Sequence, residues 1–140
     1  MSTIAETQEE IVQEFALLES WEDRYAHLIE MGRELPRLPA EARTDDKLVK
    51  GCQSSVWLLA RRADGRMIYE AESDALIVEG LIALLLRVYS NRTPAEILAA
   101  DTAFLDRVGL SRHLSPSRTN GLHSMIRHIR RYAELASAAG

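Results

Sequence analysis

A stretch between residues 76 and 88 is apolar on almost every side of a helix, and it constrains the fold more than any other feature. Its apolar members are Leu76, Ile77, Val78, Leu81, Ile82, Leu84, Leu85, Leu86 and Val88. A helix without a polar face must be covered all round, so a helix from about Asp74 to Tyr89, capped by Ser73, is predicted at the centre of the core. Gly80 inside it costs roughly 1 kcal/mol relative to alanine, which predicts the close approach of another backbone.

Further helices are predicted on both sides of this stretch. They cover residues 3–15, 20–32, a short segment that Thr93 opens, 102–108 and 119–136. Thr3 with Glu6, and Thr93 with Glu96, have the spacing of capping boxes. The first two of these helices are interpreted mostly as packing elements.

The segment between residues 55 and 71 changes to the period of a strand. Residues 55–62 are predicted to form a strand largely buried on both faces, and Asp64 with Gly65 predicts a turn into a return strand over residues 67–71. The expected result is a single domain over residues 1–140, of α+β class, in which helices pack on a small antiparallel sheet.

The chain is weakly acidic and its charge is unevenly distributed. Lys plus Arg number 17 and Asp plus Glu number 21, so the formal net charge is −4, and general nucleic-acid binding is not expected. Residues 1–30 are rich in acids, and residues 111–140 are rich in arginines. One interpretation is that two solvated helix faces attract each other across the fold. The other is a surface that docks a partner.

Nothing in the sequence predicts export or membrane association. The first ten residues have neither the basic segment nor the apolar core of a secretory signal. No run of apolar residues reaches the roughly 18 that a membrane span needs. A cytoplasmic, reducing compartment is therefore expected, in which a free thiol persists.

Cys52 is the single cysteine of the chain and lies just before the predicted strand. It can form no internal disulfide, and it cannot build a cysteine-based zinc site alone. Most free cysteines are small buried hydrophobes, which is one interpretation. Gly51 allows a sharp bend, however, and Lys47 and Lys50 favour thiolate over thiol, so the other interpretation is a nucleophile on a loop.

Two other chemistries have weaker support. A cysteine hydrolase usually places its thiol at a helix N-terminus beside an oriented histidine, whereas Cys52 precedes a strand and the histidines lie on helices or beyond them. His123 and His128 are five residues apart, on different faces of a helix, and lack a carboxylate companion. No metal site is therefore expected.

Three ordered motifs resemble those of one family. Residues 51–58 read GCQSSVWL and resemble the active-cysteine motif of the SufE/CsdE family of sulfur acceptors. Residues 73–83 read SDALIVEGLIA and resemble its core-helix signature, and residues 110–122, with HLSPSR and NGL, resemble its C-terminal signature. The resemblance extends over roughly residues 8–136. It departs modestly at Lys50, where many members carry proline.

The resemblance implies a SufE/IscU-like α+β fold with a small antiparallel three-stranded sheet packed against several helices. It also implies a persulfide relay, in which Cys52 takes sulfur from a PLP-dependent cysteine desulfurase of SufS or CsdA kind. The sulfur then passes to an iron–sulfur scaffold such as a SufB-like complex. On this interpretation the protein is a carrier and activator, not an independent enzyme, and has no cofactor of its own because the PLP belongs to the desulfurase.

Four residues besides Cys52 are candidates for binding a partner or positioning the loop. Lys50 and Gln53 flank the thiol. Asp74 either caps the core helix or anchors the loop or a partner, and Arg118, in the predicted loop before the last helix, is either a surface arginine or takes part in docking or loop movement. A lone thiol fits such a relay, because a second one could attack the persulfide and release sulfide. We expect a mobile loop and a thiol partly sheltered by apolar neighbours.

Overall fold

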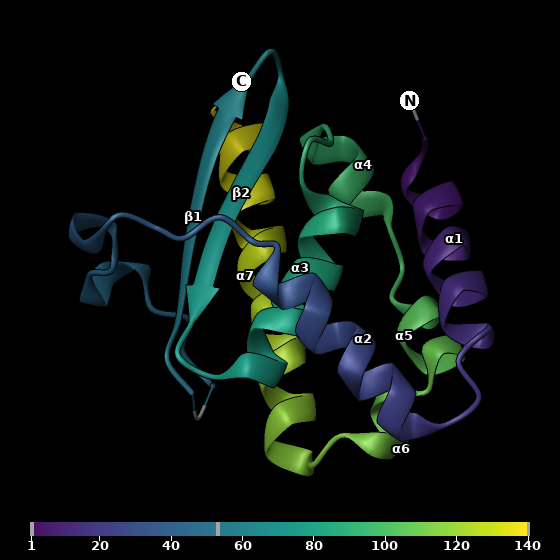
Figure 1. The fold of residues 1–140 in the computed structure, drawn as a ribbon. Coiled ribbons are helices and arrows are strands. Elements are labelled where there is room, and N and C mark those ends of the chain that lie inside the picture. Colours follow the sequence, from purple (N-terminus) through teal and green to yellow (C-terminus); the bar gives the residue numbers. More distant parts are fainter. Residues whose placement is uncertain (1, 53, 140) are drawn as a thin grey trace.

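The computed structural model describes residues 2–52 and 54–139 and arranges them as helices packed against one side of a β-hairpin (Figure 1). The elements are α1 (Ile4–Ala16), α2 (Trp21–Arg33), the short 3₁₀ turns η1 (Ala40–Ala42) and η2 (Asp45–Lys47), β1 (Val56–Ala63), β2 (Arg66–Ser73), α3 (Leu76–Tyr89), α4 (Pro94–Ala99), α5 (Ala103–Val108), α6 (Leu110–His113) and α7 (Pro116–Ala138). The predicted capping boxes of α1 and α4 are both present, with Glu6 and Glu96 as the returning acids.

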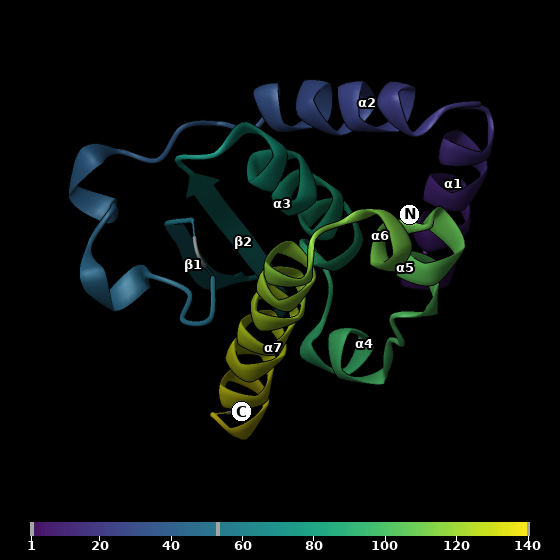
Figure 2. The same ribbon diagram turned by 90° about the horizontal axis from the view of Figure 1, so that it is seen from below.

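The apolar helix α3 lies at the centre of the fold, as its sequence predicts. It lies between α2 on one side and α7 with the hairpin on the other (Figure 2), and it also contacts α1. Leu84, Leu85 and Val88 are completely shielded from solvent. None of the helices in the described part of the chain is long and apolar enough to cross a membrane.

The close backbone approach that Gly80 predicts is made by α2. A Cβ atom built on Gly80 would lie 2.6 Å from the carbonyl carbon of Leu28, and one built on Gly32 would lie 2.6 Å from the backbone nitrogen of Gly80. Real Cβ atoms do not approach backbone atoms so closely. The two glycines therefore allow α2 to cross α3 at backbone contact.

The sheet is an antiparallel pair, and the prediction of three strands is wrong for the described residues. The register runs from Val56 opposite Ser73 to Ala63 opposite Arg66. The segment before β1 pairs with it only at an isolated bridge between Leu48 and Trp57. Two 3₁₀ turns precede that bridge, and the chain turns again directly after it. Too little extended backbone is left there to form a third strand.

The hairpin has one buried face, so the prediction of a strand buried on both faces is also wrong. Val56 and Leu58 of β1 are buried, whereas Trp57 and Leu59, which alternate with them, are half-buried. The helices cover the hairpin on a single side (Figure 2), which leaves the alternate residues facing outward. The turn is as predicted, because Asp64 and Gly65 both have positive φ, 54° and 76°.

Two helices begin at other residues than the sequence predicts. The N-cap of α3 is Ala75, and no side chain caps it, so neither Ser73 nor Asp74 is its cap. Leu76, predicted within the core helix, is 58% exposed, although Val78 and Glu79 of the same first turn are buried. Helix α7 begins at Pro116, which places Arg118 in its first turn and not in a loop.

The acids of α1 do not pair with the arginines of α7. Glu9 instead pairs with Arg107 of α5, and Glu14 pairs with Arg87 of α3 and with His27 of α2. Within the described residues, no ion pair joins an acid of residues 1–30 to an arginine of α7, so any attraction between the two charged ends does not take the form of direct ion pairs. The arginines of α7 are left for other contacts.

Candidate functional site

Cys52 lies in the loop that leads from Leu48 to the start of β1, and its side chain lies against the N-terminal half of α7. Its Sγ donates a hydrogen bond to the carbonyl oxygen of Gly121 over 3.5 Å. The residue is half-buried. This confirms the expectation of a thiol that is sheltered without being completely enclosed.

The thiol lines a cavity of about 140 Å³ between the loop, α3 and α7. Its lining combines apolar side chains with hydroxyl groups and one guanidinium. It comprises Cys52, Ser54, Val78, Leu81, Ser115, Ser117, Arg118, Gly121, Leu122 and Met125. The apolar residues reduce the hydration of the sulfur, while Ser115, Ser117 and Arg118 stand at the N-terminal end of α7.

The surroundings of Cys52 act on its pKa in two opposite ways. Burial raises the pKa of the thiol, because the thiolate loses hydration. The positive charge of Arg127 acts in the opposite direction and lowers it. Burial is the larger effect, so at rest the thiol is held mainly in its protonated form.

Gly121 and Ser124 of α7 lie directly against the cysteine loop. A Cβ atom added to Gly121 would lie 3.4 Å from the Cys52 Sγ, so the missing side chain leaves the thiol in contact with the helix backbone. Gly51 has φ +95°, a left-handed conformation that favours glycine, and its backbone packs directly on Ser124. The sequence motif Gly51-Cys52 therefore places the thiol on the turn of α7 that carries Gly121.

Positive charge without a carboxylate partner lies around the thiol. Lys50, Arg118 and Arg127 form no ion pair among the described residues, although most other basic side chains of the chain do. Lys50 is exposed two residues before the thiol, and Arg118 lines its cavity. In a chain of net charge −4 this face is a local exception.

Asp74 is placed next to the thiol site and not within it. It lines a separate groove of about 380 Å³ together with Arg37, Arg43, Trp57 and other residues. Its side chain is exposed, and its backbone N–H donates to the carbonyl of Ser55 over 3.4 Å. Of the predicted site residues, the structure thus brings together Cys52 and Arg118 in one cavity. Gln53 lies outside the described residues.

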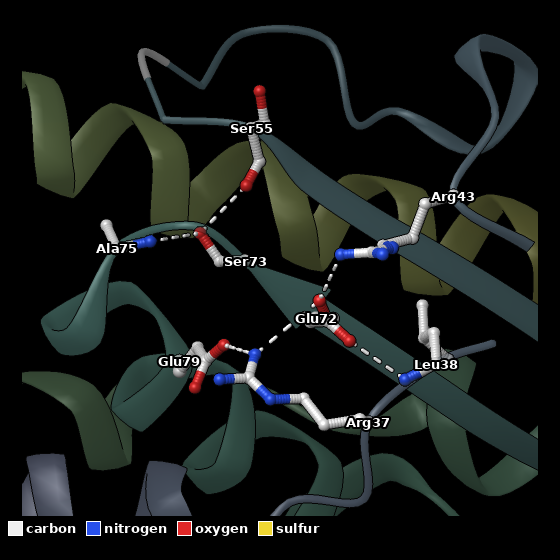
Figure 3. Close-up of polar contacts among 8 residues, drawn as sticks. All are labelled: Arg37, Leu38, Arg43, Ser55, Glu72, Ser73, Ala75 and Glu79. Carbon is white, nitrogen blue, oxygen red and sulfur yellow. Dashed lines mark hydrogen bonds and ion pairs between the residues drawn. The ribbon is translucent and has the colours of Figure 1, made fainter. Parts of the chain in front are cut away.

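A buried carboxylate attaches the segment before the cysteine loop to the hairpin (Figure 3). Glu72 of β2 accepts a hydrogen bond from the backbone N–H of Leu38 over 2.8 Å and one from Arg43 over 3.2 Å. Arg37 lies between Glu72 and Glu79, at 3.5 Å and 2.8 Å. Both carboxylates are buried and each has a cationic partner, as buried charge requires.

The other end of the loop is attached to the start of α3. The Ser73 hydroxyl donates to the carbonyl of Ser55 over 2.8 Å and accepts from the N–H of Ala75 over 3.2 Å (Figure 3). Both ends of the segment around Cys52 are therefore held by side chains of β2. Sequence reasoning missed Glu72 and assigned Ser73 only as a helix cap, since a Glu and a Ser at the end of a strand carry no signal of what they contact.

The sequence also left Ser124 and Arg127 unassigned. Together with Gly121 they follow a spacing of three residues, which places them along one face of α7. That spacing was a usable signal of a shared face, but nothing local indicates that the cysteine loop lies against it. The described residues contain no group of three or more His, Cys, Asp or Glu that could hold a metal ion.

Comparison with known proteins agrees with this geometry. The SufE family model, described as an Fe-S metabolism associated domain, matches residues 9–133. An uncharacterized SufE-like protein of Rhizobium meliloti (strain 1021) is 43% identical over 131 residues, covering 90% of this chain and 94% of that protein. An uncharacterized SufE-like protein of Rhizobium etli is 41% identical over 136 residues, covering 94% and 92%.

A solved structure shares the fold. The solution structure of a hypothetical protein from Thermus thermophilus superposes with a TM-score of 0.78 at 20% sequence identity, covering 94% of this chain and 96% of that one. At that identity the likeness shows the arrangement of helices and hairpin alone. The match of the family model across almost the whole chain, together with relatives above 40% identity, shows that the chain belongs to the SufE family.

Proposed function

We propose that this protein accepts sulfur from a cysteine desulfurase as a persulfide on Cys52 and passes it to an iron–sulfur cluster scaffold. Membership of a family associated with Fe-S metabolism supports the general process. The observation that carries the specific role is the position of the lone thiol. It is half-buried on a loop held at both ends, beside a cavity with space left next to the sulfur.

The transfer needs a nucleophilic sulfur and a place for the one it receives. The Cys52 thiolate attacks the outer sulfur of the desulfurase persulfide, a new S–S bond forms, and the old S–S bond breaks. The electron pair of the broken bond leaves with the desulfurase cysteine as its thiolate, and the outer sulfur remains on Cys52. The 140 Å³ cavity exceeds the roughly 30 Å³ that one water occupies in the liquid, so one more sulfur atom fits in it.

The partners follow from this chemistry. The donor is a desulfurase of SufS or CsdA kind, whose PLP breaks the carbon–sulfur bond of free cysteine. The acceptor is an iron–sulfur scaffold such as a SufB-like complex. The protein is then a carrier and activator that holds no cofactor and turns over no substrate alone. A lone thiol operating in this way fits a cytoplasmic, reducing compartment.

The contacts of Cys52 favour this role over a hydrolase acting alone. A hydrolase requires a histidine beside its thiol. Among the described residues, the hydrogen bond of Cys52 goes to Gly121, while His27 bonds Glu14 and His128 bonds the Ser124 carbonyl. An inert structural thiol is the other alternative, and it does not account for the unpaired cations around the loop.

The test is the release of sulfide from cysteine by a desulfurase from the same source, with and without this protein, in the presence of a reductant. Cys52→Ser is the control. The expected result is a strong stimulation that Cys52→Ser abolishes, together with the mass of one additional sulfur atom on Cys52 before reductant is added. The proposal would be overturned if both desulfurase kinds gave no stimulation and no mass gain. Turnover of an ester or amide by the protein alone would support a hydrolase.

A further inference from the structure

Three residues of α7 lie in a row beneath the cysteine loop. Gly121 contacts the Cys52 side chain, Ser124 lies under the backbone of Gly51, and Arg127 follows one turn further on. A spacing of three residues keeps side chains on one face of a helix. Helical side chains also lean toward the N-terminus, which directs the Arg127 side chain back toward Ser124 and the loop.

The hydroxyl of Ser124 holds the guanidinium of Arg127 in this position. Arg127 Nη2 donates to Ser124 Oγ over 2.8 Å. Ser124 is only 1% exposed, so its hydroxyl does not exchange this partner freely with water. Arg127 itself is exposed and forms no ion pair among the described residues, so its charge is not neutralised by a carboxylate.

We infer that Ser124 is a positioning residue which holds the Arg127 guanidinium beside the cysteine loop, and that Arg127 stabilises negative charge on the sulfur of Cys52. This rests on the proposed function, in which the thiolate is the attacking species. The effect has a specific purpose in a sheltered site. The apolar lining protects the sulfur but disfavours its charged form, and a fixed cation restores part of the reactivity without opening the cavity.

The other charged residues near the thiol do not stabilise negative charge on its sulfur in this way. Arg118 lines the cavity from the first turn of α7, and Lys50 is exposed on the loop. Asp74 lies in the neighbouring groove, where it would act in the opposite direction. Of these groups, Arg127 is the one whose charge lowers the pKa of Cys52.

The experiment is the rate of Cys52 alkylation by iodoacetamide in the free protein as a function of pH. In Arg127→Gln the pH midpoint moves up, and the rate at neutral pH falls on the order of three- to ten-fold because fewer molecules carry the thiolate. Arg127→Lys restores part of the lost alkylation rate, since the positive charge is kept. The pH midpoint of Ser124→Ala lies between those of wild type and Arg127→Gln, because the guanidinium loses the hydrogen bond that holds it.

The matched control is Arg131→Gln, which removes a charge from the same helix at a residue that pairs with Glu134. It is expected to leave the midpoint unchanged. A merely structural role of Arg127 would scale the rate equally at every pH, and an unchanged midpoint in Arg127→Gln would overturn the inference. Sulfur uptake by wild type from the desulfurase is measured in parallel. Its absence would reject the relay itself, whatever the midpoints are.

Discussion

The Cys52 thiol and the Gly121 carbonyl are joined by a hydrogen bond of 3.5 Å, at a residue of α7 that has no side chain. The helix backbone thereby forms one wall of the thiol site. A methyl group at residue 121 would stand 3.4 Å from the sulfur, which is an ordinary contact distance. An alanine would therefore fit at residue 121. The missing side chain of Gly121 instead affects how accessible the thiol is.

Gly121→Ala is expected to stabilise the protein while shielding the thiol. Alanine is favoured over glycine inside a helix, so the free energy of unfolding should rise by about 0.5–1 kcal/mol. The added methyl covers part of the sulfur, so alkylation of Cys52 should slow. Thermal denaturation and alkylation kinetics measure the two effects. A loss of stability would show that the loop is packed more tightly on α7 than these distances indicate.

Gly80→Ala is expected to have the opposite effect on stability, although Gly80 is also a helical glycine. Its added Cβ would meet the backbone of Leu28 at 2.6 Å, and a backbone cannot rotate away as a side chain can. Overpacking of this kind costs about 2–3 kcal/mol, which exceeds the gain in helix propensity. The melting temperatures of the two alanine variants, compared with wild type, should therefore shift in opposite directions.

Local signals in the sequence predicted much of the fold. Both capping boxes, the Asp64–Gly65 turn and the central position of α3 depend on residues close in sequence and were confirmed. The backbone contact at Gly80 also followed from a glycine in an otherwise strongly apolar helix. The number of strands could not be predicted in this way, because a third strand depends on how far residues 34–50 extend alongside the hairpin.

The site was predictable only where the family motifs reach it. Cys52 and Arg118 lie in one cavity, but the contact of Gly51 with Ser124 joins segments far apart in the sequence, and a serine within a helix carries no local sign of it. The same holds for Glu72, whose partners come from the segment before the loop. Leu76 was assigned to the core because its neighbours are apolar, and it is exposed.

Glu72→Ala is expected to destabilise the protein and release the segment before the cysteine loop. The substitution leaves the N–H of Leu38 without its partner and the guanidinium of Arg43 without its nearest carboxylate. The loss should be about 2–4 kcal/mol. Limited proteolysis should then cut between residues 34 and 50, and Cys52 should be alkylated faster.

Glu70→Ala is the matched control for this effect. Glu70 lies on the same strand but is about half exposed, and it pairs with Arg61 at 3.7 Å on the outer face. Exposed pairs of this kind contribute little, so its loss should change the free energy of unfolding by no more than about 0.5 kcal/mol. Equal losses for the two variants would show that the buried carboxylate is not an anchor.

The reactivity of Cys52 should increase with pH over a range above that of an unfolded cysteine. Burial raises the pKa of the folded thiol, so the unfolded chain loses this proton first as the pH rises. The linked stability is therefore present below the unfolded pKa and is lost as the pH rises through the folded pKa. Alkylation midpoints in native buffer and in concentrated urea test this. A lower midpoint in native buffer would contradict it.

If the proposed function holds, Leu76 is expected to be a docking contact for the desulfurase partner. It is 58% exposed and stands on the first turn of α3, between Asp74 of the groove and Val78 of the thiol cavity. Large apolar side chains at the edge of a transfer site gain free energy when a partner covers them. Leu76→Ser should therefore weaken the apparent affinity for the desulfurase about three- to ten-fold, while the melting temperature remains nearly unchanged.

Leu17→Ser provides the comparison that makes this decisive. Leu17 is 83% exposed at the C-terminal end of α1 and lines neither the cavity nor the groove beside it. Its substitution removes more exposed apolar surface than Leu76→Ser does, without touching the thiol site, so the concentration needed for half-maximal desulfurase stimulation should stay that of wild type. If both serine variants weaken stimulation equally, the desulfurase does not recognise the edge of the site through Leu76. If Leu76→Ser alone weakens it, the first turn of α3 forms part of the docking surface together with the loop that carries Cys52.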